Sequence, residues 1–180
     1  GTHAAIDDDH NAEAIDRRSR SHSANEAEAS KPDWEDVPGV ENLLSLAGTW
    51  EVSSKSLQPG ITATAWRLKS EPWIAWLTKS PSGEVLGIEL SGYDTSEDQF
   101  IHFSAHRNAG YSTYVGKWNE NEASIEWNAQ YPDGSHHQML ERVGADELVN
   151  NSVFTDSNNV AGETTITTLK RLRAERFQDD

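Results

Sequence analysis

The sequence predicts an all-β fold, an up-and-down antiparallel β-barrel of about eight to ten strands preceded by a short helix or turn. After Gly48, short runs with the alternation of a half-buried strand follow one another, and hairpin-sized turn sequences separate them. A meander of this length must close or split into two sheets, because an open sheet would expose two long edges. Most of the seven tryptophans lie within these runs, and bulky rings with one polar atom suit the inside and the ends of a barrel.

The entry to the barrel is predicted at 40–46, where large apolar residues recur with helical spacing. After Gly48 the period changes to two, so that Trp50 and Val52 share one side of the first strand. The clearest strand is 84–93, in which large apolar residues alternate with small or polar ones. The other predicted strands are 61–69, 73–78, 99–105, 112–118, 123–129, 136–143, 147–154 and 164–172.

Composition divides the chain into three parts. The 180 residues have a mean hydropathy of -0.73, and the polar residues are concentrated before Lys31. A segment with so few large apolar side chains cannot offset its ordering entropy by burial. We therefore expect a disordered acidic leader at 1–33, a single barrel domain at 34–174 and a charged C-terminal tail at 175–180.

The net charge of -15 and the pI near 4.7 argue against nucleic acids and anionic membranes as partners, because phosphate would be repelled. The absence of cysteine excludes disulfides and thiolate chemistry. No apolar run approaches the roughly 18 residues of a membrane span. The chain begins with Gly1, which fits both removal of a signal peptide and a residue left by cloning, and the sequence does not decide between them. We expect an exported protein, periplasmic or secreted, slightly in preference to a cytoplasmic one. It is expected to be a monomer or a homodimer.

The sequence contains none of the common enzyme motifs. There is no Gly-x-Ser-x-Gly elbow, no phosphate-binding glycine loop and no His-Glu-x-x-His zinc helix. His102 and His106 are four residues apart but begin in a strand, so they do not form a helical metal site. Glu89 and Glu126 are expected to face outward, opposite the apolar side of their strands. We expect a binding protein without a metal or a catalytic site.

Gly48-Thr49-Trp50 resembles the signature of the calycin superfamily, which includes the lipocalins and the fatty-acid-binding proteins. In lipocalins this Trp caps the closed end of the barrel beneath a cationic side chain from near the last strand. The resemblance implies that Arg171, or Lys170, lies over Trp50, a cation–π contact of roughly 0.5 to 2 kcal/mol. The longer pattern, with Gly92-Tyr93-Asp94 and with Gly116 near Trp118, is similar to uncharacterised bacterial lipocalin-like domains.

Within the same superfamily, nitrobindin-like haem proteins open on Gly-x-Trp-x-Gly-x-Gly. This chain departs from that pattern, because Val52 and Ser54 stand where the two further glycines would be. Haem would also need a proximal imidazole on a barrel strand, for which His102, His136 and His137 are the candidates. No cofactor is therefore expected, and haem is kept as an alternative.

The expected function is binding of a small hydrophobic or amphipathic molecule inside the barrel. Periodicity separates the two faces of a strand without saying which one points inward, and an alternative for 99–105 places Ile101 and Phe103 inside with His102 outside. A second hypothesis is a structural or interaction module whose barrel is filled by side chains. The residues expected to line the pocket are Trp66, Leu68, Leu86, Ile88, Leu90, Tyr114, Trp118, Ile125 and Trp127.

Overall fold

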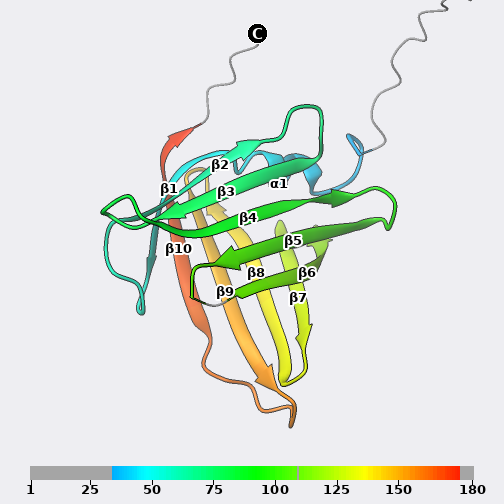
Figure 1. Cartoon of the computed structure of the whole chain (residues 1–180). Coiled ribbons are helices and arrows are strands. Elements are labelled where there is room, and N and C mark those ends of the chain that lie inside the picture. The colour runs from blue at the N-terminus through cyan, green and yellow to red at the C-terminus, as the bar shows by residue number, and fades with distance from the viewer. Residues whose placement is uncertain (1–33, 109, 175–180) are drawn as a thin grey trace, which may run out of the picture. The chain divides into compact units, whose positions relative to one another are not determined.

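The computed structural model describes residues 34–108 and 110–174, which contain one short helix and a closed antiparallel β-barrel (Figure 1). Consecutive strands pair as neighbours, and β1 closes the barrel against β10. This confirms the predicted fold class. The predicted leader at 1–33 and tail at 175–180 lie outside the described residues. The elements are α1 (Val40–Leu44), β1 (Gly48–Ser54), β2 (Ile61–Arg67), β3 (Trp73–Lys79), β4 (Val85–Asp94), β5 (Gln99–His106), β6 (Gly110–Asn119), β7 (Ser124–Tyr131), β8 (Gly134–Gly144), β9 (Glu147–Asp156) and β10 (Thr165–Ala174).

Helix α1 lies at the end of the barrel where β1 begins and β10 ends, and we call this end the base. Its side chains Val40, Leu43 and Leu44 are buried, so the apolar face of the helix packs against the base of the barrel. Gly48 then starts β1 at a φ of 146°, a conformation that residues with a β-carbon rarely adopt. Glycine at this position thus allows the chain to pass directly from the base into the first strand. No helix among the described residues has the length and apolar character needed to cross a membrane.

Trp50 is the centre of the base. Its side chain is 0% exposed, and its indole Nε1–H donates a hydrogen bond of 2.9 Å to the carbonyl oxygen of Leu46. The β1–β10 register pairs Trp50 with Arg171, and the guanidinium carbon of Arg171 lies 4.2 Å from the centroid of the indole ring. A cation at this distance over a buried indole is attracted by the ring face and is poorly screened by water.

Arg171 also binds the turn that follows α1. Its two terminal nitrogens donate hydrogen bonds of 3.0 Å each to the carbonyl oxygens of Ala47 and Ser45. Its Nε lies 3.4 Å from a carboxylate oxygen of Asp146. The residue therefore joins the last strand, the ring of Trp50 and the turn between α1 and β1.

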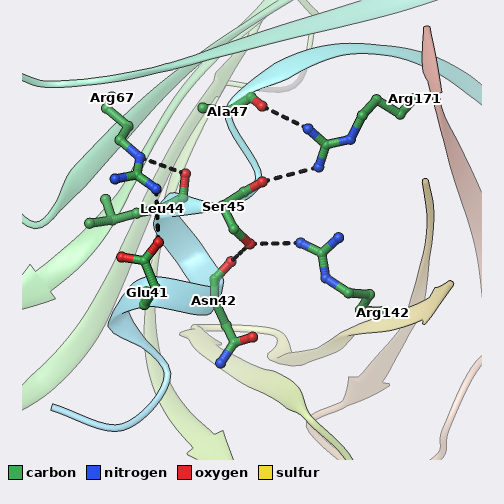
Figure 2. A network of polar contacts seen from close by, with 8 residues as sticks. All are labelled: Glu41, Asn42, Leu44, Ser45, Ala47, Arg67, Arg142 and Arg171. Carbon is green, nitrogen blue, oxygen red and sulfur yellow. Dashed lines mark hydrogen bonds and ion pairs between the residues drawn. The ribbon is translucent and has the colours of Figure 1, made fainter. Parts of the chain in front are cut away.

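Two further arginines approach the same turn, as Figure 2 shows. Arg67 donates from Nε to the carbonyl oxygen of Leu44 at 3.0 Å and forms an ion pair with Glu41 at 3.1 Å. Arg142 donates to the Ser45 hydroxyl at 2.8 Å. Carbonyl groups at the C-terminal end of a helix lack intrahelical partners and attract positive charge. Arg67 and Arg171 bond carbonyl groups at this end of α1, Arg142 bonds the Ser45 hydroxyl, and together they hold the end of the helix on the barrel.

The outer surface of β2 to β6 has an unusually apolar face. The register places Leu90 beside Phe103 on the neighbouring strand, and Phe103 stacks on Tyr111 with ring centroids 6.1 Å apart. Ile88 is 56% exposed, and Trp66 is also exposed on this side. The prediction that Trp66, Ile88 and Leu90 point into the barrel is therefore wrong: they lie on the outer face.

We predict that Trp50→Ala lowers the free energy of unfolding by about 3–5 kcal/mol, because the change leaves a cavity beneath a buried cation. Urea denaturation of the full chain measures the change. An unaltered unfolding midpoint would contradict the role of Trp50 as the plug of the base.

For Arg171→Lys we expect a loss of about 1–3 kcal/mol, because lysine keeps the charge but cannot bond both carbonyl groups. The matched control is Lys170→Met, on the exposed side of the same strand, which should change the stability by less than about 0.5 kcal/mol. Equal effects of the two substitutions in urea denaturation would contradict this account.

Candidate functional site

The barrel interior contains two cavities that share part of their lining. The lower chamber, next to the base, has a volume of about 150 Å³. The upper chamber, of about 650 Å³, extends to Leu57 and Asp133 in the loops at the opposite end, which we call the mouth. The lower chamber has a largely apolar floor, formed by Leu43, Leu46, Ala63, Trp76, Trp127, Leu140 and Leu169.

A ring of mainly polar side chains lies where the chambers meet. We call these residues the belt, because each of them lines both cavities and they come from strands around the barrel. The belt consists of Val52, Thr78, Glu89, His102, Gln138, Asn150 and Thr167. It places hydrogen-bonding groups between the apolar floor and the upper chamber, which suits an amphipathic occupant.

Glu89, Ser91 and His102 form the most closely associated group in the belt region. The register places Ser91 opposite His102, and the Ser91 hydroxyl lies 2.8 Å from Nδ1 of His102. Nε2 of His102 is 3.7 Å from one carboxylate oxygen of Glu89, and Nε2 of His106 is 3.8 Å from the other. These last two distances are longer than hydrogen bonds. The carboxylate thus lies between two imidazoles without being hydrogen-bonded to either.

The positions of these groups follow from the strands. Glu89 and Ser91 share the inner face of β4, and His102, Ser104 and His106 share the inner face of β5. Gly87 leaves room for the ring of His106, because a β-carbon at position 87 would lie 2.6 Å from Nδ1 of His106. An alanine at this position would therefore displace the imidazole from the carboxylate.

Burial shifts the proton equilibria of this group. The pKa of His102 falls to about 4, chiefly because burial disfavours its charged form and secondly because His106 is near. Burial also raises the pKa of Glu89, while His106 acts in the opposite direction. His102 is therefore neutral near pH 7. In its Nε2–H tautomer, Nδ1 accepts a hydrogen bond from the Ser91 hydroxyl, and Nε2–H points toward the Glu89 carboxylate.

A hydroxyl, an imidazole and a carboxylate in sequence also occur in hydrolase triads, but the geometry here differs. In a triad the nucleophile contacts Nε2 and the acid contacts Nδ1. Here the Ser91 hydroxyl contacts Nδ1, and Ser91 is only 4% exposed. The arrangement orients the imidazole of His102 toward the cavity and does not present a nucleophile.

A second polar cluster lies higher in the barrel. The Tyr131 hydroxyl donates to the Ser112 hydroxyl at 2.8 Å, and the Tyr114 hydroxyl lies 3.0 Å from Nδ1 of His136. Burial, followed by the contact with Tyr131, raises the pKa of Tyr114, and burial lowers the pKa of His136. Tyr114 and His136 are therefore neutral hydrogen-bonding partners for an occupant of the upper chamber near pH 7.

One belt residue has an unsatisfied atom. The Asn150 amide nitrogen donates to Gln138 Oε1 at 3.4 Å, whereas Asn150 Oδ1 is buried and has no hydrogen-bond partner among the described residues. A buried polar atom without a partner costs roughly 1–3 kcal/mol. A donor on a bound molecule, or water, would satisfy it.

The structure brings some of the predicted pocket residues together. Tyr114 and Leu86 line the upper chamber and Trp127 lines the lower one. Trp118 and Ile125 border a hollow of only about 20 Å³ beside α1, so they belong to the base. Leu68 lies just after the end of β2 and does not line either chamber. The remaining predicted pocket residues, Trp66, Ile88 and Leu90, lie on the outer face, as described above.

The histidines divide between the two faces. His102 and His136 face the cavity, so the alternative that put His102 outside is wrong. His137 lies on the opposite face of β8, where its Nδ1 is 3.0 Å from Asn128 Oδ1, and it cannot ligate an interior group. Among the described residues, no group of three or more His, Cys, Asp or Glu side chains is arranged to hold a metal ion.

Sequence reasoning missed Glu89, Ser91 and Gly87, because it took the apolar side of β4 as the inner one. The even spacing of His102, Ser104 and His106 was the available signal. On a strand this spacing puts all three on one face, and their antiparallel neighbours on β4 are Ser91, Glu89 and Gly87. A polar inner surface could have been inferred had both strands been assigned together.

Comparison with known proteins found similarity to solved structures only. No family model matches the chain, and no curated protein matches it. Among solved structures, the chain is similar to the S-type phycobiliprotein lyase CPES from Guillardia theta, with 12% sequence identity and a TM-score of 0.46, over 75% of this chain and 93% of that chain. No residue role is transferred from it. The fold itself defines the class of protein: a closed antiparallel β-barrel with an internal cavity.

We predict that the stability of the protein depends on the protonation of His102. Because the folded-state pKa of about 4 lies below the ordinary value of 6.5, the unfolded chain binds the proton first as the pH falls. The stability from this group is complete above about pH 6.5 and is lost as the pH falls toward 4, by up to about 3 kcal/mol. Urea denaturation of the wild type and of His102→Gln across this range measures it, and identical pH dependences would contradict it.

Proposed function

We propose that this protein binds one small amphipathic molecule inside its barrel. The observation that carries the proposal is the upper chamber of about 650 Å³, which has the size of a small-molecule site. It shares the belt with the apolar lower chamber. An occupant could therefore place an apolar group on the floor and polar groups against the belt and the tyrosine cluster.

The cavity also bears on the two alternatives. A barrel filled by side chains would leave no chamber of this size. Haem carries two propionates, and none of the described residues that line the chambers is Lys or Arg. Of the inward-facing candidate ligands, His102 directs Nε2 toward Glu89 at 3.7 Å. The residues present do not suit haem, and we assign it no role.

We expect a cavity-filling substitution to weaken the binding of Nile red, a neutral solvatochromic dye. Thr167 lines both chambers, and Thr167→Trp should lower the affinity by at least about tenfold, because the indole takes up the space of the ligand. A fluorescence titration with the full-length chain measures the affinity.

The matched control is Thr168→Trp, one residue further along β10 and therefore on the outer face. It should bind the dye like the wild type. Wild-type protein that leaves the dye spectrum unchanged, or equal binding by both variants, would contradict interior binding. Circular dichroism checks that each variant is folded.

A further inference from the structure

Apart from histidines, the ionisable side chains that line the upper chamber among the described residues are carboxylates and tyrosines. Two carboxylates, those of Glu89 and Asp133, line the upper chamber. Among the described residues, no lysine or arginine lines either chamber. The interior thus differs from a site built for a carboxylate or phosphate ligand, in which Arg or Lys normally supplies the paired charge.

The nearby arginines are engaged beneath the floor. Arg171 bonds the carbonyl oxygens of Ala47 and Ser45, and Arg142 bonds the hydroxyl of Ser45 and the carbonyl oxygen of Ala145. These hydrogen bonds join both guanidinium groups to loops at the base, and their charge stabilises the base.

The carboxylate of Glu89 is available to a ligand. Its side chain is 24% exposed and lines both chambers. The nearest imidazole nitrogens are 3.7 and 3.8 Å away, too far for hydrogen bonds. Thr78 on β3 and Ser104 on β5 also line the chamber that Glu89 faces, and neither carries a charge. A carboxylate held away from bulk water is costly unless a cation or donor pairs with it.

We propose that the barrel selects cationic amphiphiles, and that Glu89 binds the protonated amine of the ligand while an apolar group occupies the lower chamber. This inference rests on the proposed interior binding. Next to Glu89, the apolar floor includes Trp76, Trp127 and Leu169, so a cationic group and a short apolar chain can be accommodated together. The net charge of -15 favours the approach of cations to the protein.

The experiment uses three probes with the same chain: octylamine, 1-octanol and octanoate. Each displaces Nile red from the full-length protein at about pH 7.5 and about 150 mM salt, where long-range surface attraction is largely screened. We expect octylamine to bind about tenfold more tightly than 1-octanol, and octanoate more weakly than either, because only the amine pairs with Glu89.

Glu89→Gln should remove the preference for octylamine over 1-octanol, because the amide has nearly the same shape as the carboxylate but carries no charge. The control is Glu51→Gln, which removes one charge from the exposed side of β1 and should keep the preference. Glu89→Met is the second uncharged variant should Glu89→Gln not fold.

Equal displacement by octylamine and 1-octanol, or a preference that survives the loss of the Glu89 charge, would overturn the cationic selection while leaving interior binding intact. Octanoate as the tightest probe would overturn it as well. Failure of Nile red and of all three probes to bind would instead overturn the proposed function itself, so the two failures are distinguishable.

Discussion

The buried contact between Trp50 and Arg171 is the constraint on which the rest of the structure depends. It joins β1 to β10, the pair that closes the barrel, and it ties both strands to the turn after α1. Because the guanidinium satisfies carbonyl groups that would otherwise be buried without partners, the end of a very short helix can lie inside the base. One side chain thus provides closure, packing and hydrogen bonding.

The closed base determines where the cavity is. Apolar residues of α1 and of the lower strands fill one end of the barrel, and the space above them stays open toward the mouth. Polar side chains can face this space because cavity water or a ligand can solvate them, whereas the same groups in a packed core would lose hydrogen bonds. The division into an apolar floor, a belt and an upper chamber lined by both polar and apolar side chains follows from this geometry.

Strand β4 does not follow the rule that the apolar side of an alternating strand faces the interior. Its apolar residues Ile88 and Leu90 alternate with Glu89 and Ser91, and the usual rule puts the apolar side inside. Here Glu89 and Ser91 face the chamber, while Ile88 is exposed on the outer face. The rule assumes that the inside is a dry core, and it reverses when the inside is a polar cavity.

By itself, the sequence determined the all-β class, the order and extents of the strands, the helical entry and the pairing of Trp50 with a cation near position 171, because these follow from local period, turn residues and a short motif. Only the tertiary structure decided which face of each strand points inward, and with it the group of Glu89, Ser91 and His102. Residues from β4 and β5 meet across the strand register. That register depends on the closure of the whole barrel, which no local pattern along one strand contains.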